Sequence, residues 1–226
     1  MLGVRRVGHG GTLDPAASGV LPILVGAATR FSARLHEASK VYDATVRFGI
    51  ETTTDDREGA VVRETPAPVL DGATIERGLS GLRGVITQLP PAYSALKIAG
   101  RPAYARARAG EEVTLRAREV QVHRLDVIAV QSADVRLLVV CSAGTYVRAI
   151  ARDLGRALGS AAHLRALRRL AVGALDVRDA PTIDELRALG RDAVVRRLRA
   201  ADASLLALDR QYLERPATIV AGESRT

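Results

Sequence analysis

The sequence predicts a folded protein of mixed helix and strand with a strand-rich core. Three stretches have the β-branched composition or the alternation of strands, and three others have the periodicity or the capping residues of helices. Hydrophobic residues make up 47% of the 226 residues and charged residues 26%, which is typical of a globular protein and not of a disordered one. A chain of this length forms one or two domains.

The strand candidates follow an opening segment that resembles a loop. Up to about residue 30 the chain is rich in Gly and Pro, so we expect loop there rather than regular structure. Residues 40–50 alternate apolar and polar side chains, imperfectly at Tyr42, which predicts a strand. Residues 120–130 and 134–141 are two further candidates, and their β-branched content indicates neighbouring strands of one sheet.

Three other segments are candidates for helices. Residues 73–82 suit a short helix, and residues 145–158 place their apolar side chains on one helical face. Residues 182–198 also favour a helix, with Thr182 as N-cap and Glu185 in the position that completes a capping box. The predicted strands and helices therefore alternate irregularly along the chain, with no internal repeat.

The charge balance favours a polyanionic partner. Lys and Arg number 33 against 25 Asp and Glu, for a formal net charge of +8, and nucleic acid is the first candidate for such a partner. The dominance of Arg and Ala is also what a GC-rich coding bias produces, so charge alone does not decide the matter. Clustering of the arginines around a candidate site would decide it.

Cysteine usage and hydropathy indicate the compartment. The single cysteine, Cys141, lies in an apolar run, so it excludes an intrachain disulfide and favours a reducing compartment. No apolar stretch approaches the roughly 18 to 20 residues of a membrane span, and the N-terminus has no signal-peptide pattern. We therefore expect a cytoplasmic protein without a membrane partner.

One loop gathers small residues around a single carboxylate. Residues 8–19 read GHGGTLDPAASG, a composition that lets a large ligand approach the backbone closely. The loop lacks the Lys-[Ser/Thr] ending of a phosphate-binding P-loop and is not a GxGxxG turn before a helix, which disfavours nucleotide binding of those kinds. Asp14 is thus a candidate catalytic carboxylate, and an ordinary turn aspartate is the alternative.

Four further stretches accompany this loop in a specific order. They are SKVY at 39–42, PPAYSALK at 90–97, GTYVR at 144–148 and HLRALRRL at 163–170. Together with the loop they closely resemble the signature stretches of the bacterial TruB-type tRNA pseudouridine synthases, and the resemblance covers residues 4–179. It implies an α+β fold with a mixed, mainly antiparallel sheet, flanking helices and a cleft across the middle of the sheet.

The resemblance also implies an activity. Family members isomerise uridine to pseudouridine in the T-loop of tRNA, at position 55, on a flipped-out nucleotide and without cofactor or metal. In the family the aspartate matching Asp14 acts either as nucleophile at C1′ or as base at C2′, and both alternatives stay open. The counterpart of Arg148 pairs with that aspartate. The counterpart of Tyr42 stacks on the target base and accepts the C5 proton, directly or through water.

These roles agree with elementary chemistry. Glycoside hydrolases usually need two carboxylates, one of them to protonate a poor leaving group, whereas uracil leaves as a delocalised anion. One carboxylate can therefore suffice. It must stay ionised where water is excluded, so an opposite charge has to offset the effect of burial on its pKa. The fixed charge and forked donors of Arg148 suit that task.

Further residues are expected at the substrate. The resemblance places His9 beside the vacated base stack and Leu167 in the pocket, where core packing is the alternative role. Gly11, Thr12, Lys40 and Lys97 complete the expected substrate-binding set.

Residues 92–118 follow two prolines and are interpreted as a projecting insertion. Tyr93 and Tyr104 in this insertion either stack on bases or anchor it by packing. The basic residues form three clusters that resemble the RNA-clasping parts of the family: Arg5, Arg6 and Arg30; Lys97, Arg101, Arg106 and Arg108; and Arg165, Arg168 and Arg169.

The chain departs from the family pattern at both ends. Family members usually begin earlier, with a strand, a Lys-Pro-Gly-type loop and a helix, so we expect an N-terminally shortened catalytic domain over residues 1–180, with its RNA-binding insertion at about 90–118. Residues 181–226 are expected to form a short helical appendage, a truncated C-terminal RNA-binding domain, with weaker tRNA affinity than in longer relatives. The expected partner is the T-arm of tRNA and the expected state a monomer. The alternative function is a non-catalytic or weakly active RNA-binding or tRNA-folding protein on the same scaffold.

Overall fold

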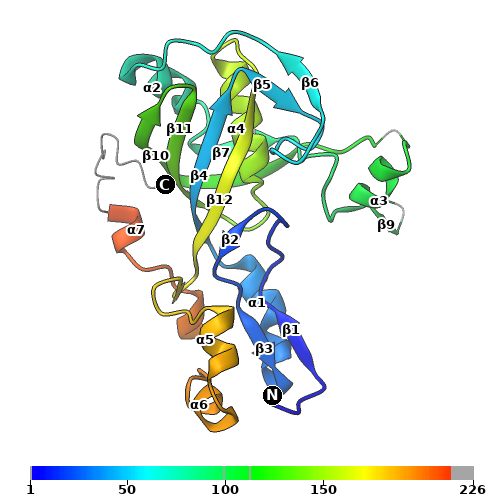
Figure 1. Cartoon of the computed structure of the whole chain (residues 1–226), viewed down its shortest axis with the longest axis vertical. Helices are drawn as coiled ribbons and strands as arrows, with labels where there is room; N and C mark the ends of the chain where they lie inside the picture. The colour runs from blue at the N-terminus through cyan, green and yellow to red at the C-terminus, as the bar shows by residue number, and fades with distance from the viewer. Residues whose placement is uncertain (1, 99, 112, 215–226) are drawn as a thin grey trace.

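A mixed, mainly antiparallel sheet forms the centre of the molecule (Figure 1). The computed structural model describes residues 2–98, 100–111 and 113–214. The strand order is β13-β12-β4-β11-β10-β7, and all these pairs are antiparallel, whereas β2 pairs in parallel with β12. The predicted sheet type is thereby confirmed. The strands are β2 (Ser18–Gly19), β4 (Lys40–Phe48), β7 (Gly84–Gln88), β10 (Arg118–Gln131), β11 (Asp134–Cys141), β12 (Ala162–Val172) and β13 (Leu175–Asp176).

The three strands predicted from composition are all present. Residues 40–50 correspond to β4, which ends at Phe48 because Gly49 adopts φ +96°. The other two form the hairpin β10–β11, which turns through Ser132 at φ 52°. Cys141 ends β11 and is 1% exposed, as its place in an apolar run leads one to expect.

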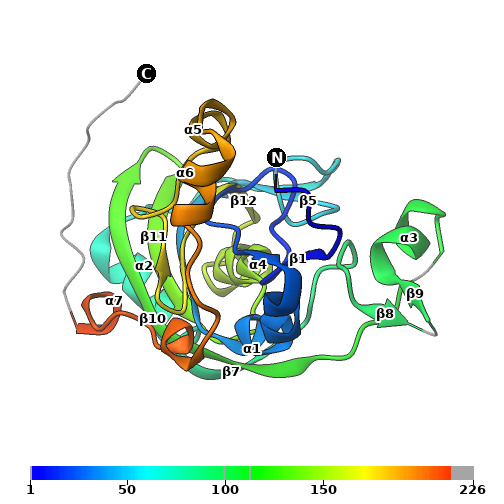
Figure 2. The same cartoon turned by 90° about the horizontal axis from the view of Figure 1, so that it is seen from below.

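Helix α4 (Val147–Ala157) packs against this sheet, beside β12 and β4. Strands β10, β11 and β7 curve around it in the view of Figure 2. Its apolar face buries Ile150 and Leu154 completely, and each such side chain contributes roughly 1.5–3 kcal/mol by leaving water. Helix α2 (Gly72–Ser80) packs on α4 where Gly78 allows close approach, since a β-carbon there would lie 2.8 Å from Leu154. Both helices were predicted at these places.

The opening segment is not a loop throughout, and that prediction is wrong. It contains a pair of three-residue strands, and two short helices follow. Apolar side chains of these elements form a second hydrophobic cluster. Strands this short form because the chain pairs with itself, not because their composition favours strands, so periodicity does not reveal them. The elements are β1 (Val7–His9), β3 (Ile23–Val25), η1 (Gly26–Phe31) and α1 (Ser32–Glu37).

A short hairpin and a helix project from the sheet after β7, to the right in Figure 1. They fall within the segment predicted to be an insertion. The elements are β8 (Lys97–Ile98), β9 (Arg101–Pro102) and α3 (Ala103–Arg108). A separate hairpin of β5 (Ile50–Thr52) and β6 (Val61–Glu64) continues from β4.

The predicted helix over 182–198 is two helices, α5 (Ile183–Ala188) and α6 (Arg191–Arg196). The capping box of Thr182 and Glu185 is confirmed, with reciprocal side-chain to backbone hydrogen bonds. The helix stops because Leu189 is extended and Gly190 becomes the N-cap of α6. The elements η2 (Ala203–Leu206) and α7 (Gln211–Glu214) follow, and the predicted appendage ends outside the described residues. Within the described ranges, no helix is long and apolar enough to cross a membrane.

Candidate active site

The Asp14 carboxylate and the Arg148 guanidinium face each other across two parallel hydrogen bonds. Arg148 Nε donates to Asp14 Oδ2 at 2.9 Å, and Nη2 donates to Oδ1 at 3.1 Å. The Arg148 side chain is 6% exposed and that of Asp14 is 34% exposed. A bidentate pair of this kind fixes the plane of the carboxylate as well as its charge. The Asp14 carboxylate therefore stays partly accessible to a ligand, whereas the Arg148 guanidinium that neutralises it is buried.

The remaining donors of Arg148 hold its guanidinium in place. Nη1 donates to the carbonyl oxygens of Thr54, at 3.0 Å, and of Tyr93, at 3.1 Å. A second carboxylate, that of Asp56, lies 3.7 Å from Nε. Because its fork is bound on several sides, Arg148 is oriented before any ligand arrives.

The start of α4 is positioned by a clamp from the end of β7. Gln88 accepts a hydrogen bond from the backbone N–H of Tyr146 at 2.8 Å and donates to the carbonyl of the same residue at 3.1 Å. Gln88 is fully buried, and Tyr146 is the N-cap residue of α4. Arg148, two residues later, thus begins from a fixed backbone.

Hydrogen bonds from Arg169 of β12 hold the loop that carries Asp14. The Arg169 side chain is buried, and it donates to the carbonyl oxygens of Val20 (2.8 Å), Thr12 (3.2 Å) and Gly11 (3.1 Å). Gly11 adopts φ +132°, a conformation that other residues rarely take. Gly11 and Thr12 therefore contribute backbone oxygens to the support of the loop.

Tyr42 of β4 is partly buried and lies in register with Arg169 on β12. Burial raises the pKa of its hydroxyl above the usual value, whereas the positive charge of Arg169 opposes the rise and the weaker effect of the Asp14 charge adds to it. Leu167 lines a shallow pocket together with Asp14 and Arg148. The structure thus brings Asp14, Arg148, Tyr42 and Leu167 to one region of the sheet.

Two family models match nearly the whole chain. The model described as "TruB family pseudouridylate synthase (N terminal domain)" matches residues 1–147, and that described as "tRNA pseudouridylate synthase B C-terminal domain" matches residues 148–210. The chain belongs to the TruB family. TruB enzymes are isomerases, so the suspected family and enzyme class are confirmed.

Curated TruB relatives are similar over most of the chain. The tRNA pseudouridine synthase B of Thermobifida fusca is 50% identical over 196 residues, 83% of this chain and 67% of the relative. That of Aromatoleum aromaticum is 47% identical over 214 residues, 95% of this chain and 69% of the relative. The chain thus spans about two thirds of the length of these proteins.

Solved structures agree with this TruB fold. A chain in the crystal structure of a Cbf5-Nop10-Gar1 complex is 30% identical, with a TM-score of 0.61, over 82% of this chain and 46% of that chain. A chain in the structure of an H/ACA RNP bound to a substrate RNA containing 2′-deoxyuridine also has a TM-score of 0.61, over 94% of this chain and 53% of that chain, but at 23% identity it supports the fold alone. This chain spans about half the length of both.

The ammonium of Lys40, one of the expected substrate-binding residues of this TruB chain, is bound inside the protein. Lys40 is 7% exposed, and its ammonium donates to the carbonyls of Leu35, His36 and Ala38 at the end of α1. Burial lowers the pKa of Lys40 to about 8. The structure therefore does not support a direct substrate contact for Lys40.

His9 lies on exposed β1, its ring 6.1 Å from that of His36. The backbone of Lys97 is in β8, and its side chain lies outside the described part of the chain. The positions of these two residues therefore leave their predicted roles at the substrate as predictions.

The arginines of the three basic clusters of this TruB chain differ in exposure and in pairing. Arg5, Arg6, Arg30 and Arg168 are exposed, and exposed Arg165 pairs with Asp134. In the insertion, Arg101 and Arg106 pair with Glu111, and Arg108 lies 5.7 Å over the ring of Tyr104. The expectation that Arg169 contacts RNA is wrong. Its side chain does not face solvent, because the loop carbonyls that it binds lie inside the protein.

Four charged residues of this TruB site were missed by the sequence analysis. Asp55 and Asp56 follow a run of three threonines, and nothing in the sequence linked this segment to Arg148. Arg169 was assigned to a basic cluster at the RNA, and Arg152 was not named as a site residue. All four lie within the layer of side chains that supports Asp14 or Arg148.

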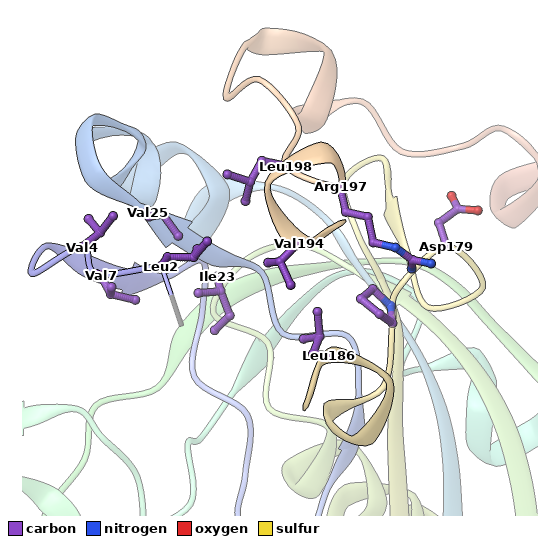
Figure 3. Close-up of a pocket in the computed structure, with 12 residues that line it drawn as sticks. Leu2, Val4, Val7, Ile23, Val25, Asp179, Leu186, Val194, Arg197 and Leu198 are labelled. Carbon is purple, nitrogen blue, oxygen red and sulfur yellow. The ribbon is translucent and has the colours of Figure 1, made fainter. Parts of the chain in front are cut away.

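A second hollow lies between the β1–β3 hairpin and helices α5 and α6 (Figure 3). Its lining is mainly apolar, including Val7, Ile23 and Leu186, and it shares no residue with the pocket at Asp14. Within the described ranges, no group of three or more His, Cys, Asp or Glu side chains is placed to hold a metal ion.

Proposed function

We propose that this protein isomerises uridine to pseudouridine at position 55 in the T-loop of tRNA, with Asp14 as the catalytic carboxylate. The observation that carries the proposal is the Asp14 carboxylate held by two N–H groups of buried Arg148. The curated relatives bear the name tRNA pseudouridine synthase B, which supports tRNA as the substrate.

The reaction breaks the N1–C1′ bond of a uridine, turns the released uracil, joins C5 to C1′ and removes the proton from C5. Nothing is oxidised or reduced. Asp14 either attacks C1′, forming an ester that is later displaced, or removes the C2′ proton and returns it. Both routes need an ionised oxygen beside the sugar, and the partly exposed Asp14 carboxylate offers one.

Arg148 supports either route by its charge. A carboxylate covered by a nucleoside would otherwise be driven toward its protonated form, because burial penalises the charge. Two charge-assisted hydrogen bonds from Arg148 oppose this effect and orient the carboxylate oxygens. The role is electrostatic, and the guanidinium exchanges no proton at any step.

Tyr42 serves the last step in this proposal. A tyrosine hydroxyl is protonated at neutral pH, and burial raises its pKa further, so the C5 proton passes to a water that the hydroxyl orients rather than to a phenolate. The ring face is available for stacking on the displaced uracil.

The exposed arginines supply the RNA contacts in this proposal. Arg165 and Arg168 flank Leu167 of the pocket, and backbone phosphates attract such residues in a salt-dependent way. His9 fills the gap left by the flipped base, and the projecting segment that contains α3 grips the T-arm. The protein acts as a monomer in the cytoplasm, where tRNA and a reducing environment occur together.

The experiment replaces one carboxylate. Asp14→Asn is expected to lower tritium release from C5-tritiated tRNA by at least about a thousandfold, because the amide neither attacks nor removes a proton. The control is Asp184→Asn, whose side chain is 90% exposed on α5, and it should release tritium at the normal rate. Release that survives Asp14→Asn would reject the assignment.

A transcript with cytidine at position 55 tests the site of reaction. It should release no tritium, whereas persisting release from this transcript would reject the T-loop assignment. If the unsubstituted protein binds tRNA with no release at all, the non-catalytic alternative holds.

A further inference from the structure

Arg152 lies one helical turn after Arg148 on α4 and is equally buried, at 5% exposure. Each of its donor groups has a partner. Nη1 donates to Asp55 Oδ2 at 2.8 Å, Nη2 donates to the carbonyl of Leu89 at 2.8 Å, and Nε donates to Asp153 Oδ1 at 2.9 Å. Two of these partners lie far away in sequence, on segments that approach α4 from different strands.

Arg148 is tied to the same two segments. Its Nη1 donates to the carbonyl of Thr54, adjacent to Asp55, and to that of Tyr93, four residues after Leu89. The two guanidiniums are separated by one turn, a rise of about 5.4 Å along α4. Each arginine therefore contacts both the turn at 52–56 and the segment at 89–93.

The backbone of Asp55 is held in an unfavourable conformation in this arrangement of the turn at 52–56. It adopts φ 59°, a left-handed conformation that is uncommon for a residue other than glycine, and it is 7% exposed. Burial raises the pKa of its carboxyl, and the Arg152 charge opposes that rise. A buried ion pair contributes little net stability as a rule, but it selects one arrangement of the chain among several.

We propose that Arg152 is a positioning residue for the isomerisation, because it fixes the two segments whose carbonyls orient Arg148 and so Asp14. It does so by donating hydrogen bonds to the Asp55 carboxylate in one segment and to the Leu89 carbonyl in the other. Arg152 contacts neither substrate nor the reacting atoms. The inference rests on the proposed function and adds to it a layer of residues behind the catalytic pair.

Arg152→Lys tests the proposal with the charge retained. A lysine places a single ammonium where the fork now spans Asp55 and the Leu89 carbonyl, so it cannot hold both in the same geometry. We expect kcat to fall by roughly tenfold to a hundredfold, as misplacement of catalytic groups by about 1 Å does, while KM for tRNA changes by less than about twofold. The matched control is Arg156→Lys, one turn further along α4, where a 53% exposed arginine pairs with Glu51, and it should leave kcat unchanged.

Two more measurements separate positioning from folding. Asp55→Asn keeps the side-chain shape and tolerates the left-handed backbone, so it should lower kcat less than Arg152→Lys while the melting temperature stays near that of the unsubstituted protein. In the presence of Arg148→Lys, Arg152→Lys should cause no further loss of single-turnover rate, because its effect acts through Arg148.

Unchanged kcat in Arg152→Lys, or a loss accounted for by a smaller folded fraction, would overturn the inference alone. An unsubstituted protein without turnover would overturn the proposed function and the inference with it.

Discussion

A β-carbon on Gly19 would lie 2.1 Å from the carbonyl oxygen of Arg169. Gly19 is in β2, which pairs in parallel with β12, and its φ of +107° belongs to the region that favours glycine. The same Arg169 also binds the loop carbonyls through its side chain. Gly19 is thus the point where the loop that carries Asp14 meets the central sheet.

Gly19→Ala is expected to lower the free energy of unfolding by roughly 3 kcal/mol or more, because a backbone atom cannot yield to the new methyl group. Tritium release should fall with it as the loop shifts. The control is Gly81→Ala at the end of α2, where φ is −78° and the β-carbon meets nothing within 4 Å. Chemical denaturation measures both, and a Gly19→Ala protein as stable as the control would contradict the geometry.

Arg168 and Arg169, neighbours in sequence, are expected to differ in function. Arg168 is exposed, so Arg168→Gln should reduce the salt dependence of tRNA binding by about one counterion. Arg169→Met should leave the salt dependence unchanged but lower stability by roughly 3 kcal/mol, because it leaves buried carbonyls without donors. Filter binding at several salt concentrations separates the two, and an altered salt dependence in Arg169→Met would place that residue on the RNA.

Tyr42→Phe removes a single oxygen and keeps the ring. Under the proposed mechanism the late proton transfer slows, and the rate of pseudouridine formation should fall by roughly a hundredfold or more while tRNA binding persists. Tyr104→Phe, at a 42% exposed position on α3, keeps its ring as well; it is the matched control and should form product at the normal rate. Single-turnover assays decide, and a fully active Tyr42→Phe enzyme would remove the hydroxyl from the mechanism.

Asp176 is expected to make the stability of the fold depend on pH. Hydrogen bonds from Arg178, and then from Tyr212, lower the pKa of its carboxyl to about 2, against about 3.9 in an unfolded chain. A lowered pKa means that the folded state binds fewer protons in this range, so the contribution is complete above about pH 4 and is lost as the pH falls toward 2.

We expect this contribution to be about 1–2 kcal/mol, reduced because Arg178 is 60% exposed. Asp176→Asn should flatten the dependence of the melting temperature on pH between about 4 and 2. Parallel curves for the two proteins would contradict the linkage.

The parts of the fold that the sequence predicted are those with strong local signals. The β10–β11 hairpin and α4 were visible because side-chain periodicity over eight or more residues reports which face is buried. The hairpin of β1 and β3 was not, because three-residue strands carry no such pattern.

Within the site, Asp14, Tyr42 and Arg148 were predicted from ordered motifs; the structure joins Asp14 to Arg148, and the role of Tyr42 stays a prediction. Arg169 was misjudged because no strand was predicted over residues 162–172, so the alternation that exposes Arg168 and buries Arg169 was not expected. Asp55 was overlooked because its role depends on a left-handed backbone and on a partner 97 positions away.

The burial of Cys141 gives this chain a practical property. Burial raises the pKa of its thiol to about 12, and the thiolate is the form that reacts with alkylating reagents. Because the sequence contains no other cysteine, the native protein should resist such reagents until β11 separates from its neighbours. The rate of alkylation would then serve as an internal clock for opening of the sheet, and a cysteine engineered at an exposed position could carry a fluorophore without any competing label.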